Sequence, residues 1–409
     1  MNTNNITYNN YNAWFFFTLF YLLIDYGRPQ DIIPIDFLRP GMISVLILIY
    51  FIISTKNLNF STSKQVKYIW YFVILTAVYV PFVKNNFWAY TTTRTMILYL
   101  PFILSAIICV NSIERLRTII NIFVILMIYI AIYSIFHNGV GSGNYFADEN
   151  DVSLFINMWL PFCYFLFFYE KDKIKKILYA TGLIAGLAAI VVSFSRGGFV
   201  GLLCVSFVIW LVSPRKIISL VIICIAATAI YLYSGEAYIK EMSTITDTTE
   251  STANARLLSW KAAWDMFLDN PFGVGGNNFQ IRFPEYQSQE FGRGMWGHVA
   301  HSLWFTLLPE LGIVGLYIYV RLLYFNVKDI VFIKKINIVG SETKYLYLLS
   351  LAFMSSLAGF FASATFLSVL YYPHYWYITA LIVVTTKLTT NYTSKKGELV
   401  NSNIAFTES

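Results

Sequence analysis

Long apolar runs, separated by short polar or charged breaks, fill most of the 409-residue sequence. A run of about 20 apolar residues is long enough to cross a bilayer as a helix. The runs and their breaks predict about twelve membrane-spanning helices, near residues 11–27, 41–55, 67–83, 95–110, 117–136, 152–169, 176–194, 197–213, 216–233, 302–320, 345–366 and 368–386. The pattern therefore predicts an all-α, polytopic integral membrane protein.

The longest polar segment, residues 234–300, lies between the ninth and tenth predicted spans. Inside it, apolar side chains recur at helical spacing, at Leu257, Trp260, Trp264, Phe267 and Leu268. Asn254 is suited to cap the start of this helix, and Asn270-Pro271 is suited to end it. We expect an amphipathic helix that lies on the membrane or on other helices.

Composition agrees with a membrane protein, because 57% of the residues are hydrophobic and only 12% are charged. Soluble domains carry about 25% charged residues. The net charge of +7 comes from basic residues dispersed at helix ends, which argues against a nucleic-acid partner. The four cysteines are widely spaced inside apolar runs, so we expect neither a metal site nor a disulfide framework.

The distribution of Lys and Arg predicts the orientation of the chain in the membrane. Cytoplasmic loops carry an excess of these residues, and long loops count little in this rule. With the N-terminus in the cytoplasm, the even-numbered connections and the C-terminal tail hold most of the Lys and Arg, for example in residues 171–176 and 328–344. We therefore expect both termini in the cytoplasm, and Arg196 and the long loop 234–300 on the outer face.

His301 and Ser302 mark the point where the long loop turns into an apolar segment. Ser302 is a candidate N-cap, and its helix would direct unpaired N–H groups and a positive dipole end at the loop. A histidine there can exchange protons or hold a phosphate. The alternative is an interfacial histidine that only anchors the helix.

Arg196 and Arg256 are two further candidates. Arg196 lies in SFSRGGFVG, where Gly197 and Gly198 permit a tight turn between two spans. Arg256 projects from the first turn of the expected amphipathic helix, on the side of Trp260. The alternatives are an arginine that snorkels at the interface for Arg196 and a solvated surface arginine for Arg256.

Three other features carry less specific signals. Gly273, Gly275 and Gly276 form either a turn, which we favour, or a phosphate-binding nest. Asp148, Glu149 and Asp151 lie in a glycine-rich outer loop that suits a cation or a sugar, although acidic outer loops are common. Glu310, inside a predicted span, is expected to be a paired structural or functional residue.

The motifs of residues 145–320 resemble, in order and spacing, those of the O-antigen ligase family. DENDVSLFINMWLPF resembles the family's Asn-containing loop and following helix, with Asn150 as the asparagine, and SFSRGGFVGLL resembles its Ser-Arg-Gly turn. ARLLSWKAAWDMFLDNPFGVGGNNF resembles its Arg-x-x-x-Leu helix and glycine turn, with Trp260 in place of the usual Leu. AHSLWFTLLPELGIVG fits its His-Ser pattern, which ends on Gly312 and Gly315. Asp25–Pro34, DYGRPQDIIP, also resembles a segment of some O-glycosylation ligases.

The resemblance implies a fold similar to the C-type glycosyltransferases, in the inner (plasma) membrane of a bacterium. It implies transfer of a glycan from an undecaprenyl-pyrophosphate carrier to an acceptor hydroxyl at the outer face, without a metal or other cofactor. Arg196 and Arg256 would then bind the pyrophosphate, and His301 would act as a base or a phosphate ligand. Ser302, Asn150, Gly312 and Gly315 would contribute to substrate binding.

We divide the chain into N-terminal transmembrane helices (1–144), a catalytic region (145–325), C-terminal transmembrane helices (326–388) and a cytoplasmic tail (389–409). The acceptor is open, since it can be a lipid, a protein or a glycan. A polysaccharide polymerase and a protein O-oligosaccharyltransferase are therefore alternatives within the same chemistry. A flippase or secondary transporter is a more distant alternative, which would predict repeats and broken helices with midplane charges.

Overall fold

The computed structural model describes residues 3–55, 63–233, 235–243, 251–287 and 297–407, and these residues form helices and no strands. The helices on the N-terminal side are α1 (Thr3–Gly27), α2 (Pro29–Ile32), η1 (Asp36–Leu38), α3 (Pro40–Ser54), α4 (Lys64–Tyr79), α5 (Asn86–Cys109), α6 (Ile113–Phe136), η2 (Asn144–Phe146), α7 (Glu149–Tyr169) and α8 (Lys173–Val192). They are followed by α9 (Arg196–Val212), α10 (Lys216–Tyr233), α11 (Gly235–Ser243), α12 (Ser251–Asp269), α13 (Phe279–Arg282), η4 (Phe283–Glu285), α14 (Leu303–Lys334), α15 (Ser341–Ala364) and α16 (Pro373–Thr407). The prediction of an all-α protein is confirmed.

Seven helical segments in the described part of the chain are long and apolar enough to cross a membrane, namely Asp36–Ser54, Asn86–Cys109, Ile113–Phe136, Glu149–Tyr169, Lys173–Val192, Leu303–Lys334 and Ser341–Ala364. Two shorter apolar helices, Arg196–Val212 and Lys216–Leu232, follow the same pattern. The chain is thus a multi-pass membrane protein. Each of the twelve predicted segments overlaps a helix, but the number of spans remains a prediction.

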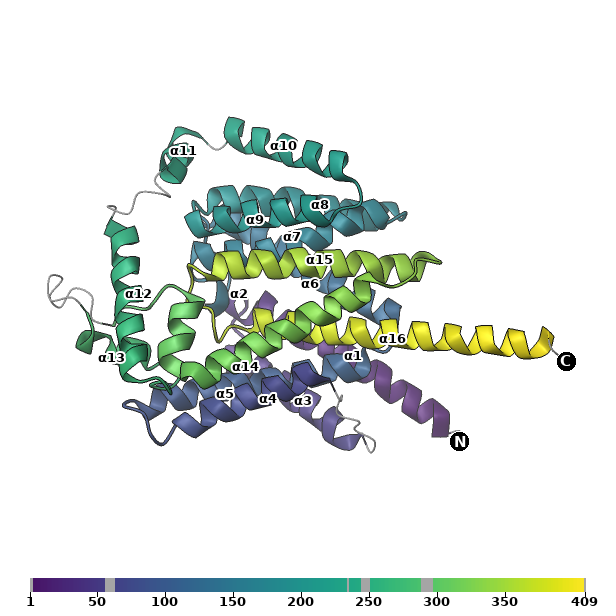
Figure 1. Ribbon diagram of the computed structural model, residues 1–409, viewed down its shortest axis with the longest axis horizontal. Coiled ribbons are helices and arrows are strands. Elements are labelled where there is room, and N and C mark those ends of the chain that lie inside the picture. Colours follow the sequence, from purple (N-terminus) through teal and green to yellow (C-terminus); the bar gives the residue numbers. More distant parts are fainter. Residues whose placement is uncertain (1–2, 56–62, 234, 244–250, 288–296, 408–409) are drawn as a thin grey trace.

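The long helices run side by side, and α12 lies across one end of the bundle (Figure 1). We call this end the α12 end. Near it, Asn157 of α7 links three helices, because its Nδ2 donates to the carbonyl of Gly198 in α9 at 2.8 Å and to Ser363 Oγ in α15 at 3.2 Å. A Cβ at Gly201 would collide with Ser363 and Asn157, so only glycine permits this close packing of α9.

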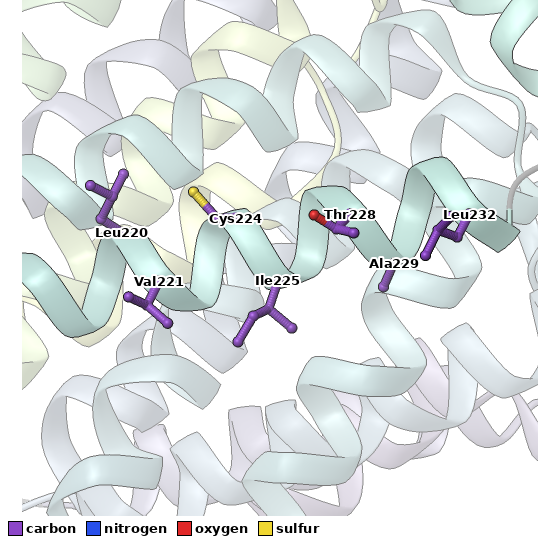
Figure 2. A pocket seen from close by; sticks show the side chains of 7 residues that line it. All are labelled: Leu220, Val221, Cys224, Ile225, Thr228, Ala229 and Leu232. Atoms are coloured by element: carbon purple, nitrogen blue, oxygen red, sulfur yellow. The ribbon is translucent and has the colours of Figure 1, made fainter.

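Helix α10 stands apart from the rest of the bundle (Figure 1). A hollow of about 540 Å³ is lined by this helix alone. Figure 2 shows the lining side chains, Leu220, Val221, Cys224, Ile225, Thr228, Ala229 and Leu232. These residues lie on the face opposite Ser219, which is buried and hydrogen-bonded to Tyr164 at 2.8 Å. The hollow is therefore a shallow, apolar, outward-facing surface and lies apart from the candidate residues.

The predicted amphipathic helix is α12, and it ends at Asp269, directly before Asn270-Pro271, as expected. Its predicted start is wrong, because the helix begins one turn before Asn254. Its packed face is formed mainly by small side chains. Ser259, Ala262, Ala263 and Met266 are buried, whereas Leu257, Trp264 and Leu268 are 44%, 45% and 59% exposed. Small side chains let α12 approach its neighbours closely, which leaves large apolar side chains on the outside.

Helix α14 is interrupted at Gly312, whose φ of 61° and ψ of −162° are non-helical. The interruption frees backbone groups that pair with the glycine turn after α12. Val274 N donates to Pro309 O, Gly275 N to Glu310 O and Ile313 N to Pro271 O, at 2.8, 2.8 and 2.9 Å. A Cβ on Gly312 would collide with the backbone of this turn. The first part of α14 consequently runs in a different direction from the remainder (Figure 1).

The Glu310 side chain holds the same glycine turn. Its Oε2 accepts from Asn277 N at 2.9 Å and from the Tyr371 hydroxyl at 2.7 Å, and its Oε1 accepts from Phe279 N at 3.2 Å. Glu310 is therefore the paired structural residue that the sequence suggested. Because amides of the turn donate to α14, the turn interpretation of Gly273–Gly276 is confirmed over the phosphate nest.

Candidate active site

His301 lies at the start of α14, at the α12 end of the bundle. Its φ of 45° is in the left-handed region, which non-glycine residues adopt rarely and mostly in turns. Ser302 caps α14, as predicted, by accepting from Phe305 N at 3.4 Å. Ser302 is fully buried, whereas the His301 side chain is half-buried. The cap thus places the imidazole at the edge of the bundle.

The beginnings of α7 and α9 meet beside this histidine. Asp148 caps α7, and its Oδ1 accepts from Asn150 N and Nδ2 at 2.7 and 2.6 Å. The oxygen of the Asn150 amide accepts from Ser195 Oγ at 2.6 Å. Ser195 in turn caps α9 by accepting from Gly198 N at 2.8 Å. Arg196, the first residue of α9 and half-buried, is therefore fixed next to the start of α7.

Trp260 joins α12 to this region. Its indole Nε1 donates to Ala300 O at 2.9 Å, directly before His301. Its ring stacks on Phe305 of α14 with a centroid distance of 5.1 Å and lies 6.3 Å from the ring of Phe366. A Cβ on Gly197, beside Arg196, would also touch Phe366, at 3.4 Å. Phe366 thus lies between the first turn of α9 and the part of α12 that carries Arg256.

The surroundings of His301 lower its pKa to about 4, from an ordinary value near 6.5. Burial is the largest cause, and the positive charge of Arg256 is the next. His298, whose ring centroid lies 5.3 Å from that of His301, lowers the pKa further, while the Asp148 carboxylate raises it. His301 is consequently a neutral imidazole at pH 7. Arg256 also acts electrostatically on Glu149, so it faces the start of α7.

The structure thus gathers four of the predicted residues, His301, Arg256, Arg196 and Asn150, around the beginnings of α7, α9 and α14. Ser302 is covered by protein, and Gly312 lies under the backbone of Pro271 and Phe272. The assignment of Ser302, Gly312 and Gly315 to substrate binding remains a prediction.

Sequence reasoning gave Asp148 only a general role and overlooked Phe366. The role of Asp148 has a sequence signal, since an Asp before an apolar helix is a typical N-cap. Phe366 has no such signal. It follows α15, far from α9 and α12 in the sequence, and only the folded chain brings it to them.

A model of the O-antigen ligase family matches residues 180–320, about a third of the chain. The match begins after the Asn150 motif and includes the motifs around Arg196, Arg256 and His301. No curated protein matches the chain significantly. The resemblance to the O-antigen ligase family is thus confirmed for residues 180–320, the part of the chain that carries these two arginines and this histidine.

Proposed function

We propose that the protein is a membrane glycosyltransferase that transfers a glycan from undecaprenyl pyrophosphate to an acceptor hydroxyl. One observation carries the proposal. His301, Arg256 and the first turn of α9 lie together at one end of a membrane bundle, and all three belong to the region that matches O-antigen ligases. Two guanidinium groups are suited to bind the pyrophosphate, and a neutral imidazole is suited to accept the proton of the acceptor hydroxyl.

In the proposed reaction, the acceptor oxygen forms a bond to the anomeric carbon of the glycan while the bond from that carbon to the pyrophosphate breaks. The lipid pyrophosphate leaves with the electron pair. Arg196 and Arg256 stabilise its growing negative charge through two-pronged hydrogen bonds, which are strongest in a site that excludes water. Neutral His301 takes the proton of the acceptor hydroxyl.

The acceptor decides which member of this enzyme class the protein is. In a reconstituted membrane with undecaprenyl-pyrophosphate glycan, we expect transfer to one of three acceptors: a lipid A core for a ligase, a Ser or Thr peptide for a protein enzyme, or a second lipid-linked glycan for a polymerase. Transfer to none of the three, together with movement of the intact donor across the bilayer, would support a flippase instead.

The proposal also requires the α12 end to face outwards in a bacterial inner membrane. The opposite end carries Lys at the starts of α4, α8 and α10, in agreement with a cytoplasmic face. Lys261→Cys, on the exposed side of α12, should react with a membrane-impermeant thiol reagent in intact spheroplasts. Asn337→Cys, between α14 and α15, should react only after permeabilisation. The reverse pattern would overturn both the orientation and the proposed donor face.

A further inference from the structure

A cluster of aromatic side chains joins α1 and α16 at the α12 end of the bundle. The hydroxyl of Tyr26 in α1 lies 2.9 Å from Nδ1 of His374 in α16, and both side chains are buried. The His374 ring stacks on Phe146 of η2, with a centroid distance of 5.7 Å and an interplanar angle of 21°. Phe146 is fully buried, and it lies two residues before Asp148.

The orientation of the His374 ring depends on Tyr26. Nε2 of His374 is buried without a hydrogen-bond partner among the described residues, so the bond between Nδ1 and the Tyr26 hydroxyl is the one hydrogen bond that orients the ring within its aromatic surroundings. In a neutral imidazole, the bond made by one ring nitrogen sets both the tautomer and the ring orientation. The Tyr26 ring itself also stacks on Phe155 of α7, at 5.1 Å.

Segment η2 leads directly to the candidate active site. Gly141 N donates to Phe146 O at 2.8 Å, and Phe146 N donates to Gly143 O at 3.1 Å, so Phe146 holds this loop together. The chain then reaches Asp148, which acts electrostatically on His301, and Asn150, which holds Ser195 beside Arg196. The position of Phe146 therefore influences both sides of the site.

We propose that His374 is a positioning residue, whose ring, fixed by Tyr26, holds Phe146 and thereby places Asp148 and Asn150 at the active site. The inference rests on the proposed function as far as its effect on glycan transfer is concerned. The inference gives a role to Tyr26, in the DYGRPQDIIP segment, and to His374. Neither residue has a step in the proposed transfer reaction.

Tyr21 provides a matched control for Tyr26. It is also a buried tyrosine of α1, and its hydroxyl also bonds to α16, at 2.8 Å from the hydroxyl of Tyr377. Its ring packs on Phe102 and Tyr377 and has no ring contact with η2 among the described residues. Tyr21→Phe and Tyr26→Phe therefore remove similar hydrogen bonds, but only Tyr26 bonds directly to the His374 ring that stacks on Phe146. The Tyr21 hydroxyl is linked to η2 only indirectly, through Tyr377, Asp25 and Tyr145.

In Tyr26→Phe and in His374→Phe, we expect kcat to fall about tenfold with little change in the KM for the donor, because a small misplacement of active-site groups slows the chemical step. Tyr21→Phe should keep the wild-type kcat. The Asp148 carboxylate raises the pKa of His301, so displacing Asp148 should lower that pKa. The acid-side step in the pH profile of kcat should therefore also move to lower pH. Asp148→Asn retains a capping side chain and should produce the same shift, as a positive control.

Hydrogen exchange tests the inference without glycan transfer. Amides of residues 141–150 should exchange faster in Tyr26→Phe and His374→Phe than in wild type, and at the wild-type rate in Tyr21→Phe. Equal exchange in all four proteins would overturn the inference, whatever the outcome of the transfer assay. Equal loss of kcat in Tyr21→Phe and Tyr26→Phe would also overturn it, since it would show only a general weakening of the contact between α1 and α16.

Discussion

Glycan transfer is expected to fall about 100-fold when Arg256 is replaced by lysine, the loss typical of removing one donor from a preorganised charge-stabilising site. Lysine keeps the positive charge and loses the planar pair of N–H donors that matches a phosphate. Arg196→Lys should cause a similar loss, because Arg196 is the second proposed pyrophosphate ligand. The contact between Ser195 and Asn150 holds it at the start of α9. The measurement is the initial rate with purified, reconstituted protein, together with the amount of protein in the membrane.

Arg282→Lys is the matched control for these two variants. Arg282 is also an arginine at the α12 end, but it pairs with Glu285 at 2.9 Å and donates to Asn270 at 2.9 Å, and neither partner belongs to the candidate site. We expect its lysine variant to transfer glycan at close to the wild-type rate. Near-normal transfer by Arg196→Lys and Arg256→Lys would instead identify these arginines as interfacial cations and remove the proposed pyrophosphate site.

Local sequence signals predicted those parts of the site that depend on local structure. The Ser302 cap and the end of α12 at Asn270-Pro271 follow from the hydrogen-bonding capacity of serine and from the missing N–H of proline, and both are present. The apolar runs likewise predicted where the long helices lie. A long apolar segment in lipid forms a helix because its backbone groups must pair with one another.

Features that depend on tertiary packing were not predictable in this way. Periodicity indicated that large apolar residues of α12 face the membrane or other helices, but it cannot show that Ala262 and Ala263 are buried and allow a closer approach. Pro309 is the usual signal for a bent helix, yet α14 breaks at Gly312, where the turn after α12 presses against the backbone. Both features arise because α12 and the turn after it pack onto the bundle.

His301 carries the second large expected effect, a loss of transfer in His301→Gln as severe as that in His301→Ala. Glutamine still donates a hydrogen bond to a phosphate, but it cannot take up a proton in this pH range. A base role therefore predicts that both variants are inactive. A phosphate-binding role predicts that the glutamine variant is partly active and that wild-type transfer falls as pH rises, because the cationic imidazole would bind best. His298→Gln is the parallel control, since His298 is the neighbouring imidazole.

The pH profile of the wild-type protein separates the two roles independently. A base must be neutral, so transfer should rise with pH through the pKa of His301 and then level off. Burial and Arg256 lower that pKa to about 4 in the free protein, so kcat/KM should have its step near pH 4 and be level at pH 7. A bound pyrophosphate adds negative charge beside His301 and opposes the effect of Arg256, which raises the pKa in the complex. The step in kcat should therefore lie at higher pH than the step in kcat/KM. Wild-type rates in His301→Ala, or transfer that falls through this range, would exclude His301 as the base.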